Sequence, residues 1–126
     1  MDNDTLYNLG EASAALGTNI QTLRRLCDSG LIPYVKRSRA GKRTLDEHQL
    51  HHARLILGLR RMGLRKNELK RYTALARQGV ETLPERKALL ETEKRQAWQK
   101  LEDIQRDIDF LERQIELMDA EMRAAE

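Results

Sequence analysis

Cysteine, proline and aromatic residues are scarce in this chain of 126 residues, which has one cysteine and two prolines, with aromatics at 4%. The single cysteine, Cys27, excludes an intrachain disulfide and any zinc site built from several thiolates of one chain. Leu, Ile, Ala, Glu, Lys and Arg dominate, which favours helices over a sheet-rich fold. The length allows one modest core.

Membrane and catalytic signatures are also missing. No apolar run approaches the length of a membrane span, and the acidic start MDNDTLYNL is unlike a signal peptide. We therefore expect a cytoplasmic protein without a membrane partner. The sequence shows no phosphate-cradling glycine loop, no Ser/His/Asp set and no carboxylate pair in a core, so neither an enzyme nor a cofactor is expected.

Charge is unevenly spread along the chain. Residues 1–80 hold 15 Lys/Arg against 7 Asp/Glu, a net of +8, whereas residues 81–126 hold 8 against 13, a net of −5. A basic part of this kind is suited to a polyanion, and the acidic part needs a different role. The charge change suggests a domain of residues 1–80 followed by one of residues 81–126.

Two short helices are predicted near the start. The first lies within NLGEASAALG and stops at Gly17, and the second lies within TNIQTLRRLCDSG and ends at Gly30. Thr18 or Asn19 can cap the second helix. Its expected inner stripe is Ile20, Leu23, Leu26 and Cys27. Two short helices joined by a tight turn form a helix-turn-helix pattern.

A small basic hairpin follows. YVKR and KRTL flank SRAG, where Gly41 can take the positive φ of a hairpin turn. A hairpin that follows a helix-turn-helix is typical of the wing of a winged helix-turn-helix. Asp46 then caps a helix that ends at Gly63, and a further short helix ends at Gly79. The expected inward residues of the longer helix are Leu50, Ala53, Ile56, Leu57 and Met62.

From about Pro84 the chain has no glycine or proline to break a helix. Apolar residues then recur at alternating intervals of four and three, which is the a/d seam of a coiled coil: Ala97, Leu101, Ile104, Ile108, Leu111, Ile115, Met118 and Met122. A helix of about 40 residues would be about 60 Å long. Because so long an apolar stripe needs a cover, we expect a homodimer.

A winged helix-turn-helix joined to a dimerisation helix is a DNA-binding architecture. The start of the second helix can reach base edges in the major groove, which nominates Thr18, Asn19, Gln21 and Thr22. Gln can pair with adenine. Phosphate contacts are expected from the helix at Arg24 and Arg25, and from the wing at Arg37, Arg39, Lys42 and Arg43.

These features together resemble the MerR family of bacterial transcription regulators. The resemblance covers residues 7 to about 75 and rests on the ordered set Leu9-Gly10-Glu11, Gly17, Leu23-Arg24, Gly30-Leu31, Gly41, Arg43, Leu50 and Met62-Gly63-Leu64. It implies an antiparallel coiled coil between protomers. It also implies a dimer on a palindromic promoter whose two elements are too far apart for RNA polymerase, and DNA distortion that aligns them.

The sequence departs from the family pattern at several positions. Arg25 and Leu26 stand where two aromatics are common, Cys27 where an acid is common, and Lys42 and Leu45 where wing tyrosines are common. Arg25 and Lys42 can replace a hydroxyl hydrogen bond to phosphate with an ionic one. A steeper salt dependence of DNA binding is therefore expected.

Three other features admit two interpretations. His48, His51 and His52 could share a helix face as metal ligands, but solvated surface is favoured and no metal is expected. Cys27 is a candidate thiol sensor beside Arg24 and Arg25, although a packed core thiol is favoured. Trp98, Tyr72 and the region of Tyr34 could border a pocket, with ordinary packing favoured.

The leading hypothesis is therefore a homodimeric, sequence-specific transcription regulator with double-stranded DNA and RNA polymerase as partners. An architectural or recombination accessory protein, of the excision or chromosome-anchoring type, is the alternative. A coiled-coil adaptor that binds another anion is a weaker third.

Overall fold

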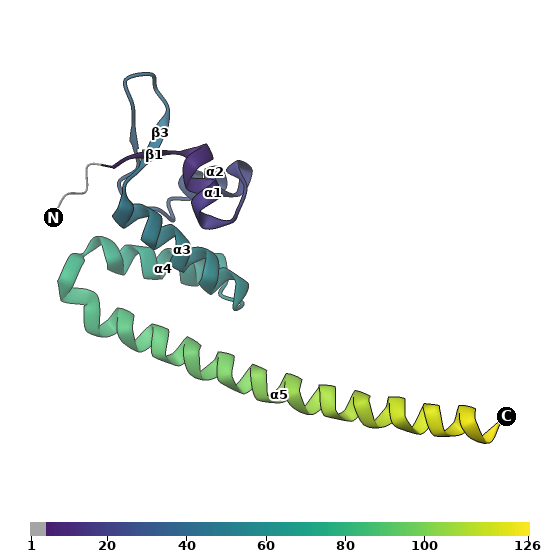
Figure 1. The fold of residues 1–126 in the computed structure, drawn as a ribbon. Coiled ribbons are helices and arrows are strands. Elements are labelled where there is room, and N and C mark those ends of the chain that lie inside the picture. Colours follow the sequence, from purple (N-terminus) through teal and green to yellow (C-terminus); the bar gives the residue numbers. More distant parts are fainter. Residues whose placement is uncertain (1–4) are drawn as a thin grey trace. The chain divides into compact units, whose positions relative to one another are not determined.

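The computed structural model describes residues 5–126, which are mainly helical with one small antiparallel sheet (Figure 1). Met1 to Asp4, part of the acidic start used against a signal peptide, lie outside the described residues. The elements run β1 (Tyr7–Asn8), α1 (Leu9–Leu16), α2 (Ile20–Asp28), β2 (Lys36–Arg37), β3 (Arg43–Leu45), α3 (Glu47–Arg61), α4 (Lys66–Arg77), the 3-10 helix η1 (Gly79–Thr82) and α5 (Leu83–Ala124). The predicted mainly-α fold with a winged helix-turn-helix is confirmed.

Two compact units divide the chain, one ending at Lys87 and the other spanning Ala88–Glu126. We call the first the head and the second the rod. The head contains every element up to the first turn of α5, and the rod contains the remainder of that helix.

The turn between α1 and α2 is set by local chemistry. Asn8 and Glu11 form a reciprocal capping box at the start of α1. Gly17 ends α1 at φ 67°, a left-handed conformation that glycine adopts without a Cβ clash. The Thr18 N–H then donates to the Ser13 carbonyl at 3.0 Å, which closes the turn and brings α2 against α1.

The wing is a three-stranded antiparallel sheet in the order β1-β3-β2. Tyr7 pairs with Leu45 on one side of β3, and Lys36 pairs with Thr44 on the other. Gly41 has φ 79°, so the positive φ predicted for the hairpin turn is confirmed. The β2–β3 loop extends away from the helices of the head (Figure 1).

The core of the head lies where α1, α2, α3 and α4 meet the end of β3. Its most deeply buried side chains include Leu23, Leu45 and Ile56. The expected burial of Leu50, Ala53 and Leu57 is confirmed. Asp46 caps α3 with Gln49 as its capping-box partner, as the sequence predicted for Asp46.

Two expected core residues are exposed instead. Ile20 is 43% exposed and Met62 is 45% exposed, so both predictions were wrong. Each lies at a helix end, Ile20 as the first residue of α2 and Met62 as the residue that caps α3. The apolar spacing continues into these positions, but at the helix ends more than two fifths of each residue stays exposed.

α5 is one uninterrupted helix of 42 residues, which confirms the prediction of a long C-terminal helix. None of its residues is buried in a single chain. No helix among the described residues is both long enough and apolar enough to cross a membrane.

Candidate nucleic-acid interface

The N-terminus of α2 presents short polar side chains to solvent. Asn19 and Gln21 are exposed, and Thr18 and Thr22 are partly exposed. The Asn19 side-chain oxygen accepts the Thr22 N–H at 2.8 Å, so Asn19 is the cap that the sequence left open between two residues. Its side-chain amide group remains available as a donor.

Arg24 and Arg25 lie on the outer side of α2. Both are exposed, whereas Leu23 and Leu26 beside them are buried in the core. Helical geometry thus separates the cations from the apolar stripe within one short helix. Both guanidinium groups can therefore contact a phosphate group that lies along the outer side of α2.

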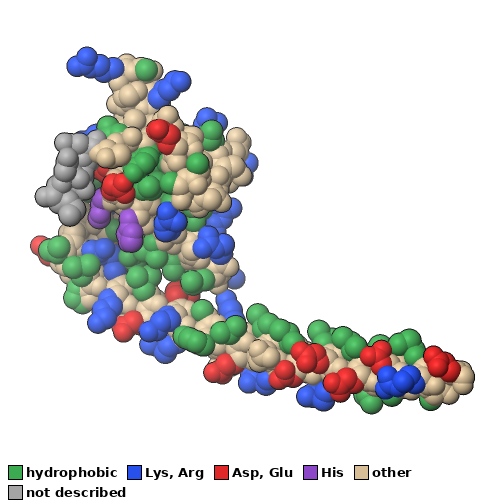
Figure 2. All heavy atoms as spheres, in the orientation of Figure 1, with side chains coloured by type: hydrophobic (Ala, Val, Ile, Leu, Met, Phe, Trp, Pro, Cys, Tyr) green, Lys and Arg blue, Asp and Glu red, His purple; other side chains and the backbone are tan. Residues whose placement is uncertain are grey.

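The wing carries its cations on a tightly hydrogen-bonded hairpin. Arg37 Nη1 donates to the Gly41 carbonyl at 2.8 Å, and the Ser38 N–H donates to the Lys42 carbonyl at 2.7 Å. Arg39 and Lys42 are exposed. Figure 2 shows Lys and Arg side chains gathered at the end of the wing.

Arg43 differs from the other wing cations because it has a carboxylate partner in the head. Its Nη2 atom lies 2.6 Å from Asp28 Oδ1, and its side chain is mostly covered. This ion pair joins β3 to the last residue of α2. The role of Asp28 could not be predicted from the sequence, because the two residues are far apart in the chain and only the fold brings them together.

The segment between α2 and the wing is held by three side chains from α3 and α4. Gln49 Nε2 donates to the Pro33 carbonyl at 2.8 Å, and Arg77 Nη2 donates to the Gly30 carbonyl at 3.4 Å. His52 Nε2 lies 3.0 Å from the Leu31 carbonyl oxygen. The wing and α2 are therefore attached to the same helical base.

The ordered glycines, caps and cations of this head match a known family. Residues 7–75, more than half of the chain, match the family described as MerR HTH family regulatory protein. The chain belongs to the MerR family.

Curated MerR-type relatives resemble this MerR-family chain over much of its length. It is 34% identical over 87 residues to the HTH-type transcriptional regulator AdhR of Bacillus subtilis, a match that covers 69% of this chain and 62% of the relative. It is 27% identical over 106 residues to an uncharacterized HTH-type transcriptional regulator of Haemophilus influenzae, covering 84% of this chain and 78% of the relative. The relatives are thus transcription regulators.

A solved structure shares most of the fold. HiNmlR, a MerR family regulator lacking the sensor domain and bound to promoter DNA in its crystal structure, superposes with a TM-score of 0.79. The sequences are 26% identical, and the match covers 88% of each chain.

Cys27 is half-buried at the inner side of α2. Burial raises the pKa of the Cys27 thiol, and the Arg43 guanidinium partly offsets this while Asp28 adds to it. The cation that acts on the thiol is thus Arg43 rather than Arg24 or Arg25. A raised pKa lowers the thiolate fraction, which argues for the packed thiol over the sensor in this MerR-family head.

The three histidines of α3 do not share one environment. His48 and His51 are exposed, as expected, but His52 is only 8% exposed, so its assignment to solvated surface was wrong. His52 stacks on Tyr72 with ring centroids 6.1 Å apart and contacts Thr73 Oγ1 at 3.1 Å. Among the described residues no group of three or more potential ligands could hold a metal ion.

The three aromatic residues considered for a pocket also differ. Tyr72 packs in the core, as expected. Tyr34 and Trp98 are 65% and 60% exposed in a single chain, so neither is a core residue of that chain. Tyr34 lies beside a cavity of the head, and Trp98 lies on the rod.

Proposed function

We propose that this chain is a sequence-specific regulator of transcription that binds double-stranded DNA as a homodimer. One observation carries the proposal: the polar start of α2 and the cationic wing are both exposed and both attached to one helical base. The likeness to HiNmlR, whose structure contains promoter DNA, supports it. A bacterial protein that binds promoter DNA would be located in the cytoplasm.

In this proposal α2 reads the major groove. Thr18, Asn19, Gln21 and Thr22 contact base edges, with Gln21 suited to adenine. Arg24 and Arg25 bind phosphates along the same groove. Arg37, Arg39, Lys42 and Arg43 bind the neighbouring backbone or minor groove, and Arg43 also holds the wing to α2 through Asp28.

The rod is proposed to dimerise the protein. Seven seam residues of the rod are 42% to 62% exposed in a single chain: Leu101, Ile104, Ile108, Leu111, Ile115, Met118 and Met122. Ala97, the eighth, is partly covered. Figure 2 shows hydrophobic side chains in a row along α5. A second copy in antiparallel orientation would cover this row and give two heads for a palindromic site.

We assign residues 1–80 to DNA binding and residues 81–126 to dimerisation. RNA polymerase is the proposed partner, because it binds both promoter elements and distortion of the promoter changes how these two elements are aligned. No observation in the head or the rod favours the architectural or recombination alternative.

The proposal is tested by fluorescence anisotropy on DNA from the region upstream of the gene, over a series of salt concentrations. Arg24→Ala and Arg25→Ala should each weaken binding and lower the slope of log K against log salt by about one, because each phosphate contact releases about one counterion. Arg60→Ala removes an exposed cation at the end of α3 and serves as the matched control.

Gln21→Ala should instead relax the preference for one base pair, at a cost of about 1–3 kcal/mol at that position. Binding without sequence preference, or binding unchanged by all three α2 substitutions, would overturn the assignment. Transcription in vitro from the bound promoter separates a regulator from an architectural protein, since the latter should leave transcript levels unchanged.

A further inference from the structure

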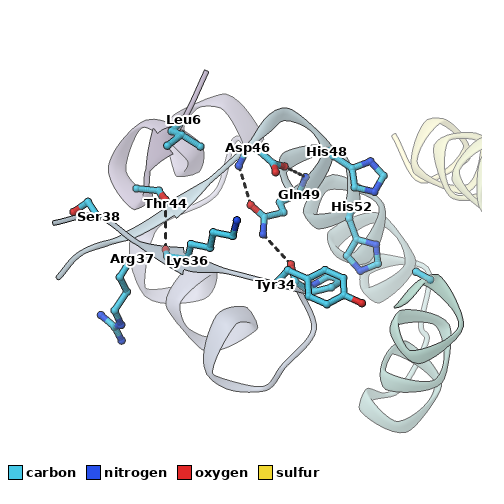
Figure 3. Close-up of a pocket in the computed structure, with 12 residues that line it drawn as sticks. Leu6, Tyr34, Lys36, Arg37, Ser38, Thr44, Asp46, His48, Gln49 and His52 are labelled. Carbon is cyan, nitrogen blue, oxygen red and sulfur yellow. Dashed lines mark hydrogen bonds between the residues drawn. The ribbon is translucent and has the colours of Figure 1, made fainter. Parts of the chain in front are cut away.

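A pocket of about 520 Å³ lies within the head, between the wing strands and the helices behind them (Figure 3). The lining residues from the wing are Lys36, Arg37, Ser38 and Thr44, and those from α3 include His48, Gln49 and His52. The volume is in the range of small-molecule sites. Of these residues only Arg37 also belongs to the DNA-binding surface proposed above.

The floor of the pocket is held by hydrogen bonds within the head. Gln49 donates through Nε2 to Pro33 and accepts the Asp46 N–H at 2.9 Å through Oε1. His52 Nε2 is engaged by Leu31 and Thr73. A ligand would therefore meet a preformed floor and would select its contacts at the rim.

Tyr34 forms part of the wall in an unusual conformation. Its φ is 61°, and it is the only described residue other than glycine with a positive φ. Such a conformation is costly for an aromatic residue and persists where the surroundings hold it. The Tyr34 hydroxyl donates to the Arg77 carbonyl at 3.3 Å, and the Arg77 guanidinium lies 5.5 Å from the ring centroid. One ring face is thus covered by Arg77, and the exposed ring borders the pocket.

The charged groups at the rim favour an anion. Lys36 forms no ion pair with any described residue, and its side chain extends from the strand toward α3 in Figure 3. His48 is an exposed residue of α3 that also lines the pocket and can donate a hydrogen bond. Asp46 supplies the pocket's one carboxylate among the described residues, and that carboxylate accepts the Gln49 N–H at 2.7 Å as the cap of α3.

We propose that this pocket binds a small organic anion with a flat apolar body. The anionic group lies on Lys36, and the apolar body lies against Tyr34, Pro33 and Ala76. Because Arg37 both lines the pocket and belongs to the proposed DNA-binding surface, an occupant would act on DNA binding through the wing. Ligand control of DNA binding rests on the proposed function, whereas binding of the anion does not.

Isothermal titration calorimetry on the full chain without DNA tests the binding. Benzoate, phenylacetate and indole-3-acetate are the anionic probes, and benzyl alcohol and benzylamine are the neutral and cationic comparisons. At least one acid should bind saturably and benzylamine should not. Lys36→Gln should weaken that acid roughly tenfold, because it removes the charge and keeps a polar side chain of similar length.

Lys66→Gln is the matched control, since it removes an exposed cation of α4 that does not line the pocket. Circular dichroism establishes that both variants are folded. Absence of saturable binding by all three acids, or equal affinity in wild type and Lys36→Gln, overturns the proposal.

The regulatory part is measured by anisotropy on operator DNA with and without the bound acid. A change in DNA affinity of about fivefold or more supports the coupling. An unchanged affinity at saturating acid overturns the coupling. If the chain binds no specific DNA at all, the proposed function fails, while the calorimetry still decides whether the pocket binds an anion.

Discussion

At the scale of single residues, His52 shows how a polar side chain can hold three segments together. Its ring lies between the Leu31 carbonyl, which precedes the wing, and Thr73 of α4, and Thr73 Oγ1 itself donates to Leu31 at 3.2 Å. The contacts satisfy a buried carbonyl that would otherwise cost free energy. Sequence spacing placed His52 correctly on α3 but could not reveal which element lies opposite.

Stability should therefore depend on pH through His52. Burial lowers the pKa of His52 from its ordinary 6.5, and the Leu31 carbonyl only partly opposes this. Near and below pH 6.5 the unfolded chain binds more protons at His52 than the folded chain does. The stability contributed by neutral His52 is therefore fully present above pH 6.5. It is lost as the pH falls toward the lower folded pKa.

Thermal unfolding at pH 7.5 and pH 5.5 measures this dependence. His52→Gln should be less stable than wild type at pH 7.5, and the difference should narrow at pH 5.5. His51→Gln, at an exposed position of the same helix, is the control and should keep the wild-type dependence. If His52→Gln lost as much stability between pH 7.5 and pH 5.5 as the wild type does, the assignment to His52 would be contradicted.

Cys27 gives a second prediction at this scale. Because burial raises the pKa of its thiol and half of the side chain is covered, we expect labelling by a thiol reagent at pH 7.5 to be slow in the native protein. The rate should be at least about tenfold lower than in the denatured chain, where the thiol has its ordinary pKa near 8.5. Native labelling as fast as denatured labelling would restore the sensor interpretation.

At the scale of elements, the first turn of α2 has two roles in one residue. Asn19 caps the helix through its side-chain oxygen and is proposed to contact DNA through its amide. Asn19→Ala should lower the free energy of unfolding by about 1 kcal/mol, whereas Asn19→Ser should retain most of the stability because serine is an equally good cap.

Chemical denaturation and DNA anisotropy on the two variants separate these roles. If the amide contacts DNA, Asn19→Ser should bind DNA more weakly at near wild-type stability. Wild-type DNA affinity in Asn19→Ser would remove Asn19 from the interface and leave it as a cap alone.

The elements whose ends are fixed by local chemistry could be predicted from the sequence. Gly17 and Gly41 required positive φ, Asp46 was a recognisable cap, and the lack of glycine or proline after Pro84 predicted α5. The residues of the candidate site were harder to predict from the sequence. Asp28 and Tyr34 gained their roles from contacts with Arg43 and Arg77, which lie far away in sequence. Periodicity also cannot tell how far a residue at a helix end is covered, as the exposure of Ile20 shows.

At the scale of the whole molecule, dimerisation should depend on the seam. Ile108 lies on the seam and is 42% exposed in a single chain. Ile108→Glu introduces a charge that two copies would bury together, so it should convert a dimer into monomers at micromolar concentration. Arg113→Glu changes charge on α5 away from the seam and should leave the dimer intact.

Analytical ultracentrifugation distinguishes the two variants. A monomeric wild type would contradict the proposed homodimer directly. A monomeric Ile108→Glu should also lose tight binding to a two-half-site operator, since one head contacts only half of the site.

The unbroken course of α5 also limits how such a regulator can diverge. A lone insertion of three or four residues would shift the apolar seam, whereas a whole heptad inserted at the centre would preserve it apart from about 20° of rotation. One heptad adds about 10.5 Å of helix, close to the length of three base pairs. In an antiparallel pair of helices both heads must also meet the same face of the duplex, which recurs once per turn of about 34–36 Å. Lineages that keep this fold would therefore retain their half-site spacing unless about three heptads were inserted.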